Sequence, residues 1–232
     1  MPTPAPDPVK SVLLQAIVPH VPFDGWSQAA FDAAVAESGV DAGAARAACP
    51  RGAVDLAVLY HEDGDRAMVA RLAQTDLANM RFRDKVATAI RLRLEVAGDK
   101  EVVRRGTSLF ALPHLAPTGA GLIWGTADAI WTALGDTSRD INWYTKRATL
   151  SAVYGSVVLF WLGDQSFDAL ATDEFIDRRI ENVMQFEKAK AQARENPLLR
   201  PVLGPLGQLF GHVKAPQGAA RDDLPGHWTP HD

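Results

Sequence analysis

The sequence contains one cysteine, Cys49, among its 232 residues. A disulfide framework within the chain is therefore excluded, and a reducing compartment is the natural expectation. Basic residues are also in the minority, because 24 lysines and arginines face 28 acids, which gives a net charge of −4. This balance excludes a generally polybasic binder of nucleic acid. The hydrophobic share of 47% and the charged share of 22% are instead typical of a folded globular protein.

The sequence lacks an apolar run that is suited to crossing a membrane. The stretch 106–127 has no Asp, Glu, Lys or Arg, but its prolines, glycines and hydroxyl residues keep its hydrophobicity too low. The stretch 148–163 is more apolar but shorter than the roughly 20 residues that a spanning helix needs. The N-terminus has neither the basic start nor the apolar region of a signal peptide. We therefore reject an integral membrane protein and expect a cytoplasmic chain that is peripheral on the inner face of the membrane.

A catalytic or metal-binding constellation is also lacking. No pair among the six histidines has the spacing that places two metal ligands on one helix face, and Pro230 separates His227 from His231. Cys49 has no neighbour that would activate its thiol, so a small buried side chain is favoured. The glycines in 119–125 follow no strand, which a dinucleotide-binding loop requires. We therefore expect neither an enzyme nor a bound metal or cofactor.

Proline is absent between Thr118 and Asn196, whereas four prolines lie in residues 1–8 and six lie from Pro197 onward. Because alternating proline blocks helix formation, residues 1–9 are predicted to be a disordered arm. The last three prolines fall in residues 215–232, which are predicted to be a disordered tail.

Residues 10–51 have the spacing of a helix–turn–helix. Ser27 is a candidate N-cap for a helix that ends near Gly39, and a short helix follows over Ala42–Ala48. From residue 52 to 195, apolar residues recur at helical spacing and no hairpin signal is present. The sequence therefore predicts an all-α domain with helices over 53–73, 77–96, 100–112, 118–134, 140–162 and 167–194.

Aromatic residues are concentrated in one part of the chain. Four of the six tryptophans, Trp124, Trp131, Trp143 and Trp161, lie within 38 residues. A large core explains this density, and so does an apolar cavity or an aromatic patch at an interface. Trp143 and Tyr144 follow the predicted start of a helix at Asp140, where side chains are often exposed. This position favours a binding surface for these two residues.

The segment 196–214 has apolar residues separated by one, three or four positions, so that they share one helix face, and it contains no acid. This pattern is typical of a helix in a membrane interface. A helix docked on the core or on a second subunit has the same pattern, and Pro201 and Pro205 weaken a regular helix. The candidate membrane-binding residues are Leu198, Leu199, Val202, Leu203, Leu206, Leu209, Phe210 and Val213.

The run Gly135–Asp136–Thr137–Ser138–Arg139–Asp140–Ile141–Asn142–Trp143–Tyr144–Thr145–Lys146–Arg147–Ala148 resembles a block of the lipid-binding accessory proteins of ubiquinone (coenzyme Q) biosynthesis, which share the fold of TetR-type regulators. Leu112–Pro113–His114 and residues 175–180 are similar to further blocks of that family. The resemblance extends over about Val12 to Phe186. It implies a TetR-regulator-like helical bundle with a vestigial helix–turn–helix over 10–51, a lipid-binding domain over 52–195 and a C-terminal amphipathic helix.

The resemblance also implies a function. Proteins of this family are homodimers that hold isoprenoid or phospholipid tails in a hydrophobic cavity and present ubiquinone precursors to the hydroxylase of demethoxyubiquinone. By this resemblance, the partner-facing residues are Asp128, Trp131, Asn142, Trp143, Tyr144 and Arg147. The residues expected to line the lipid cavity are Leu122, Ile123, Tyr154, Val157, Val158 and Trp161.

A ligand-responsive transcriptional regulator of the TetR type is the alternative function. Its recognition helix would span Asp41 to Cys49. A helix that recognises DNA needs several Arg, Lys, Asn or Gln side chains to contact bases and phosphates. Only Arg46 is present, with Arg51 beyond it, and Asp41 has the wrong charge to face a phosphate. The composition therefore favours a lipid-binding protein that does not bind nucleic acid.

Overall fold

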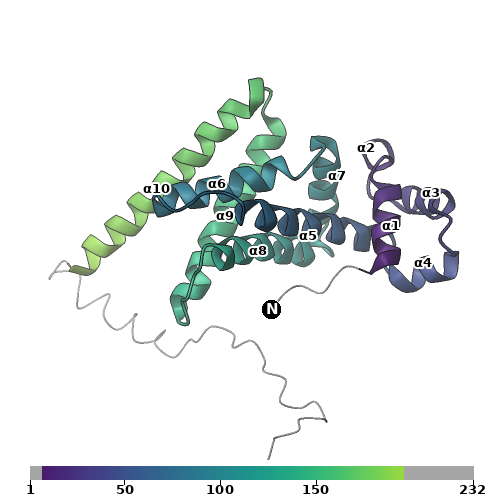
Figure 1. Cartoon of the computed structure of the whole chain (residues 1–232), viewed down its shortest axis with the longest axis horizontal. Coiled ribbons are helices and arrows are strands. Elements are labelled where there is room, and N and C mark those ends of the chain that lie inside the picture. The colour runs from purple at the N-terminus through teal and green to yellow at the C-terminus, as the bar shows by residue number, and fades with distance from the viewer. Residues whose placement is uncertain (1–6, 196–232) are drawn as a thin grey trace, which may run out of the picture.

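The computed structural model describes residues 7–195, with side chains described as far as Gln185. Within these residues all regular structure is helical and no strand occurs, which confirms the all-α prediction (Figure 1). The elements are α1 (Pro8–Ile17), α2 (Val21–Asp24), α3 (Gln28–Ser38), α4 (Ala42–Ala48), α5 (Ala53–Leu72), α6 (Phe82–Glu95), α7 (Lys100–Phe110), α8 (Ala116–Ala133), α9 (Ile141–Gly163), the 3₁₀ turn η1 (Phe167–Ala169) and α10 (Leu170–Glu195).

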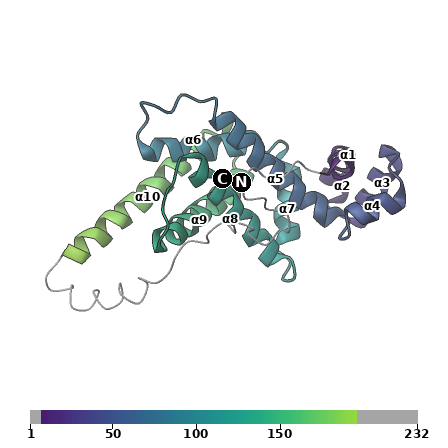
Figure 2. The same cartoon turned by 60° about the horizontal axis from the view of Figure 1, so that its bottom comes forward.

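The first four helices gather at one end of the molecule, and α10 extends from the other end (Figures 1 and 2). The predicted helix–turn–helix lies in this group as α3 and α4. The Ser27 hydroxyl caps α3 by accepting a hydrogen bond from Ala30 N at 3.2 Å, and Asp41 caps α4 through Ala44 N at 2.9 Å. Gly39 ends α3 in the left-handed conformation with φ +68°.

Two segments begin differently from their predictions. Helix α1 starts at Pro8, inside the predicted arm, because Asp7 accepts a hydrogen bond from Val9 N and proline is tolerated in the first helical turn. Helix α6 starts at Phe82 rather than at Leu77. Residues 76–81 form turns instead, in which Asp76 accepts a hydrogen bond from Ala78 N at 3.0 Å. A side-chain cap thus set the start of α1, whereas a turn before α6 delayed its start, since no side chain caps α6.

A shorter helix and a kink were also missed. Helix α2, which holds Pro22 in its first turn, is absent from the predicted helices. The last long helix was predicted from Phe167, but η1 occupies residues 167–169, with positive φ at Asp168 and Ala169, and α10 begins at Leu170. The Asp164 carboxylate accepts hydrogen bonds from the backbone and hydroxyl of Thr172, which holds the start of α10 against the end of α9.

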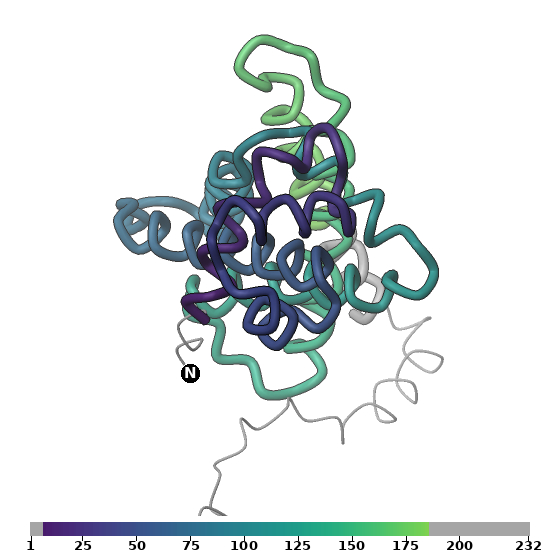
Figure 3. Tube along the Cα trace, turned by 90° about the vertical axis from the view of Figure 1, so that its right-hand side faces the viewer, coloured from purple at the N-terminus to yellow at the C-terminus, as the bar shows by residue number. Residues whose placement is uncertain are grey.

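Buried residues form two hydrophobic cores that α5 connects. The first core joins α1 to α4 with the first turns of α5 and with Val102 of α7, and it contains Leu13, Ile17 and Leu56. The second core packs the rest of α5 against α6, α8, α9 and α10. In Figure 3 the first group of helices lies in front of the second when the molecule is viewed from its α1–α4 end. None of the helices between residues 7 and 195 is both long and apolar enough to cross a membrane.

Candidate functional site

A cavity of about 540 Å³ lies where the two cores meet. Its wall takes Trp26 and Val102 from the first core and Tyr154, Val158 and Trp161 from the second. Helices α5 to α9 all contribute to this wall, and most of its residues are apolar. The volume is within the range of about 300–1,000 Å³ that small-molecule sites commonly have.

Five of the six residues predicted for the lipid cavity lie on this wall: Leu122, Ile123, Tyr154, Val158 and Trp161. The sixth, Val157, does not, since it is fully buried in the second core. A helix advances about 100° per residue, so Val157 is turned about 60° from Tyr154, on the side away from Val158. The placement of Val157 in the cavity was therefore wrong.

The sequence did not single out the polar residues of the cavity wall. Tyr60 and His61 of α5 and Arg93 of α6 all line the cavity. Two sequence signals could have revealed them. One is the charged run His61–Asp65 inside a predicted helix, and the other is Arg93 on the apolar face of the next helix. Only the packing of α5 against α6 brings these two signals together.

A cluster of hydrogen-bonded polar side chains surrounds Arg93. Its Nε donates to Asp65 Oδ1 at 2.7 Å, and its Nη2 donates to the His61 carbonyl at 3.0 Å. Thr126 of α8 donates its hydroxyl to Asp65 Oδ1 at 2.9 Å and lies 2.9 Å from Nε2 of His61. The guanidinium also lies 6.0 Å from the ring centre of Tyr154. We call His61, Asp65, Arg93, Thr126 and Tyr154 the inner polar cluster.

The inner polar cluster has no net charge at neutral pH. Burial, with a further effect of Arg93, lowers the pKa of His61 to about 3, so the imidazole is neutral. Burial likewise raises the pKa of Tyr154 to about 12, which keeps the phenol neutral. Burial also raises the pKa of Asp65, but its ion pair and hydrogen bond with Arg93 oppose that effect. The remaining charges, on Asp65 and Arg93, compensate each other.

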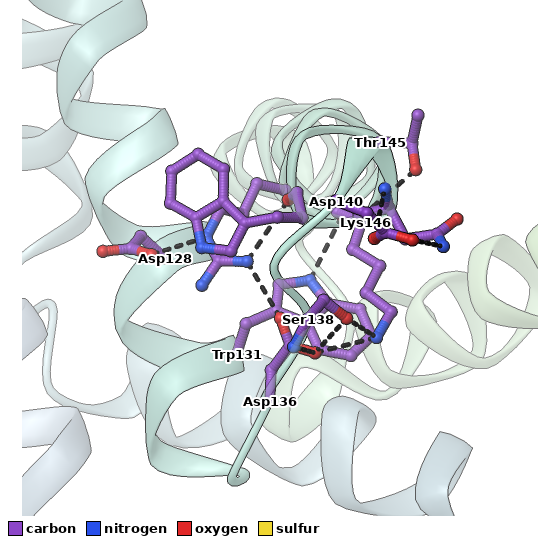
Figure 4. A network of polar contacts seen from close by, with 10 residues as sticks. Asp128, Trp131, Asp136, Ser138, Asp140, Thr145 and Lys146 are labelled. Carbon is purple, nitrogen blue, oxygen red and sulfur yellow. Dashed lines mark hydrogen bonds and ion pairs between the residues drawn. The ribbon is translucent and has the colours of Figure 1, made fainter. Parts of the chain in front are cut away.

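A second polar network holds the turn between α8 and α9 (Figure 4). At its centre the carboxylate of Asp136, 2% exposed, accepts hydrogen bonds from Ser138 Oγ and Lys146 Nζ at 2.8 Å and from Arg147 Nη1 at 3.0 Å. Burial alone raises the pKa of Asp136, but the hydrogen bonds from Lys146, Ser138 and Arg147 outweigh it and hold the pKa well below its usual range. Asp140 caps α9 as predicted, accepting from Asn142 N at 3.0 Å.

The residues predicted to face a partner divide into buried and exposed ones. Arg147 is 3% exposed and binds Asp128 at 2.5 Å and Asp136 at 3.0 Å, so its guanidinium is not presented to a partner. It lies instead 4.0 Å from the ring centre of Trp143 and donates to the Trp143 carbonyl at 3.2 Å. The arginine therefore positions the tryptophan.

Trp131 is half-buried, and like Arg147 it makes contacts with other residues of the protein that hold it in place. Its indole N–H donates to the Lys146 carbonyl at 3.1 Å, and its ring stacks on Phe82 at 5.3 Å. Trp143 and Tyr144 are half-buried and meet edge to face at 4.8 Å, whereas Asn142 is exposed. Asp128, which is 46% exposed, Asn142, Trp143 and Tyr144 thus form the accessible part of the predicted patch.

A second hollow, of about 270 Å³, adjoins this patch. Phe82 of α6, Trp131 of α8, Asn142 of α9 and Met184 of α10 contribute to its wall. Phe82 and Met184 are 48% and 49% exposed. The predicted patch therefore continues into an apolar depression between four helices.

Two further predictions concern other parts of the chain. The predicted membrane-binding residues, from Leu198 to Val213, lie outside the described residues, as does the predicted tail. In α4, the predicted recognition helix, Arg46 is exposed beside Gly43, Ala44 and Ala47, which have no side chain that can hydrogen-bond to a base.

Among the side chains described as far as residue 185, no group of three or more His, Cys, Asp or Glu is placed to hold a metal ion.

Comparison with known protein families points to ubiquinone biosynthesis. The family model described as COQ9 matches residues 116–187, which contain α8, α9 and much of α10. The mitochondrial ubiquinone biosynthesis protein COQ9 of Homo sapiens is 28% identical over 204 residues, covering 78% of this chain and 59% of that protein. The corresponding protein of Drosophila melanogaster is 29% identical over 191 residues, covering 80% of this chain and 58% of that protein. The chain thus spans about three fifths of the length of these relatives.

Comparison with solved structures supports the predicted fold. A TetR transcriptional regulator from Nitrosomonas europaea superposes with a TM-score of 0.62. The match covers 75% of this chain and 97% of the regulator, with 16% sequence identity. The TetR-like architecture predicted from the sequence is therefore confirmed.

Proposed function

Since the chain is similar to the COQ9 proteins of ubiquinone biosynthesis and has a TetR-like fold, we propose that it is a protein of this kind, which binds a polyprenyl aromatic precursor of ubiquinone and presents it to a biosynthetic hydroxylase. It does so as an accessory protein, without a catalytic site of its own. The cavity of about 540 Å³ between the two cores carries this proposal.

The physical basis is the partition of an apolar tail. A prenyl chain gains about 0.8 kcal/mol for each CH2 group that leaves water, whether it enters a membrane or a protein. A carrier must therefore offer a wall about as apolar as the bilayer. The wall formed by Ile123, Val158 and Trp161 on α8 and α9 meets this need.

Two glycine substitutions test the cavity. A Cβ at Gly155, which lines the cavity, meets no atom within 4 Å, so Gly155→Phe would fill the cavity without a clash at its base. Gly121 has equally open surroundings but does not line the cavity, which makes Gly121→Phe the matched control. We expect co-purifying lipid, measured by native mass spectrometry, to be lost in Gly155→Phe and retained in the control. Equal lipid content in both variants, or none in the unaltered protein, would contradict the proposal.

The accessible patch around Asn142 is proposed to bind the hydroxylase. Its aromatic rings and the adjoining hollow resemble the core of a protein interface, and its exposed polar groups resemble the rim. Asn142→Arg would place a bulky charge on the patch, whereas Ala70→Arg places one on exposed α5. We expect at least about tenfold weaker binding of the purified hydroxylase for Asn142→Arg and no change for Ala70→Arg, a difference of about 1.4 kcal/mol. Equal affinities would place the interface elsewhere.

The segment 196–214 is proposed to bind the membrane surface, on the basis of its apolar pattern. Truncation before Asn196 should abolish flotation with liposomes, and truncation before Ala215 should preserve it. Flotation of the shorter protein would show that another surface binds the lipid. We also propose, from the family resemblance, that the chain forms a homodimer, which sedimentation velocity would test.

A further inference from the structure

The inner polar cluster lies at one end of the cavity. On α8 the lining residues run from Gly119 to Ile123, and Thr126 lies one turn beyond them. On α9, which follows α8 across the short turn, the first lining residue is Tyr154 and the last is Trp161. The cluster therefore marks the end of the cavity that is nearer to the α8–α9 turn, and the wall beyond it is mainly apolar.

The guanidinium of Arg93 can donate further hydrogen bonds to a ligand in the cavity. Its described hydrogen bonds use Nε and Nη2, so at least two of the five N–H groups of the guanidinium have no protein acceptor among the described residues. The side chain is 5% exposed and lines the cavity. Gly64 makes room for it, because a Cβ at that position would lie 2.7 Å from Cζ of Arg93. Its remaining N–H groups can therefore donate to an acceptor that enters the cavity.

The charges around the cavity select the kind of acceptor. Arg93 is the only lysine or arginine among the described lining residues, and Asp65 already neutralises it. The lining also includes Asp63, whose carboxylate is 40% exposed and pairs with Arg66. An anionic headgroup such as a phosphate would therefore enter without a compensating cation, which is costly in a buried site. A neutral oxygen acceptor avoids this cost.

We propose that the inner polar cluster is a headgroup subsite, in which Arg93 donates a hydrogen bond to an uncharged carbonyl or hydroxyl oxygen on the ring of a lipid whose tail occupies the apolar part of the cavity. This inference rests on the proposed lipid-binding function and adds the orientation of the lipid and the charge of its head. The ring would then lie at the end of the cavity nearer to the α8–α9 turn, and Asn142 and Trp143 lie in the first turn of α9, directly after it.

Three probes with the same ten-carbon tail test the subsite: decylbenzoquinone, decylbenzene and decyl phosphate. Their affinities are measured by displacement of the apolar dye diphenylhexatriene from the full-length protein. We expect decylbenzoquinone to bind about tenfold more tightly than decylbenzene, as one hydrogen bond to a charged donor would provide. Decyl phosphate should bind more weakly than the quinone.

A pair of double variants assigns the preference to the cluster. Asp65→Leu with Arg93→Met removes both charges and leaves neither one buried alone, so we expect decylbenzene binding to persist and the quinone preference to vanish. The control, Arg71→Met with Glu95→Leu, removes an exposed ion pair of 3.2 Å between the same two helices and should keep the preference. If the first double variant does not fold, Arg93→Lys keeps the charge but loses the planar fork, and it should likewise reduce the preference.

The outcomes separate this inference from the proposed function. Failure of the unaltered protein to bind the dye or any probe would overturn lipid binding itself, and the subsite with it. Equal binding of decylbenzoquinone and decylbenzene, tighter binding of decyl phosphate, or an unchanged quinone preference in folded Asp65→Leu/Arg93→Met and Arg93→Lys would overturn the headgroup subsite alone.

Discussion

Replacement of Asp136 by asparagine should destabilise the protein substantially although it removes no atom from the packing. The carboxylate is 2% exposed and accepts from Lys146 and from Arg147, which is 3% exposed. Hydrogen bonds to a charged group contribute about 1.5–3 kcal/mol each. The bond to Lys146 counts for less, since this side chain is 37% exposed and surface pairs contribute about 1 kcal/mol or less.

Two features reduce the expected loss in Asp136→Asn. Arg147 retains its ion pair with Asp128 at 2.5 Å, so its charge is not left unpaired. The asparagine oxygen can still accept one of the hydrogen bonds. We therefore expect the free energy of unfolding to fall by about 2–4 kcal/mol, less than the roughly 3–5 kcal/mol that removal of one member of a fully buried pair costs.

Urea denaturation followed by circular dichroism measures this loss. With a slope of about 2–3 kcal/mol per molar urea, the midpoint should fall by about 1 M. Asp140→Asn is the matched control, because Asp140 is an exposed N-cap of the same turn and asparagine caps helices as well as aspartate does. Equal midpoints for the two variants would refute the claim that a buried ion-pair network holds this turn.

The pH dependence gives an independent check. The pKa of Asp136 is lowered in the folded protein, so its contribution to stability is complete above the pKa of the unfolded chain, about 3.9, and is lost as pH falls toward the lower folded value. The difference between the unaltered protein and Asp136→Asn should therefore be constant from pH 7 to 5 and shrink below about pH 4. A difference that shrinks already between pH 7 and 6 would require another titrating group.

Two further predictions concern the inner polar cluster. Gly64→Ala should lower the free energy of unfolding by about 1–3 kcal/mol, because the new Cβ would meet a guanidinium held by two hydrogen bonds, whereas Gly125→Ala, with nothing within 4 Å, should stabilise by up to about 1 kcal/mol. Equal thermal midpoints for Gly64→Ala and Gly125→Ala would refute the close packing of Arg93 against Gly64. His61 has its pKa lowered to about 3 when folded, so the unfolded chain binds its proton first and the free energy of unfolding should fall by about 2–3 kcal/mol between pH 7 and pH 4.5. His61→Gln should lack this decline, and an unchanged slope in that variant would show that His61 is not its source.

Helix positions followed largely from neighbouring residues. Ser27 and Asp140 cap the helices that they were predicted to start, because an N-cap acts on backbone groups only two or three residues away. The same local effects produced the errors at Pro8 and Phe82, where an aspartate or a turn competed with the hydrophobic pattern.

The candidate sites were predictable only in part. Helical periodicity and family resemblance placed Tyr154, Val158 and Trp161 on a face that lines the cavity. They could not reveal that Arg147 is turned inward by Asp128 and Asp136, because the burial of a charge depends on partners that the fold supplies.

The sequence alone therefore determined the all-α class, most helix boundaries and the apolar character of α8 and α9, since these depend on residues within a few positions of one another. Tertiary structure decided where the cavity lies and which polar groups face it. Arg93 and Asp65 are 28 positions apart, and Thr126 is 61 positions from Asp65. Their hydrogen bonds form only after α5, α6 and α8 have packed together. The burial that this packing brings lowers the pKa of His61, and the same packing places Arg93 on the cavity wall.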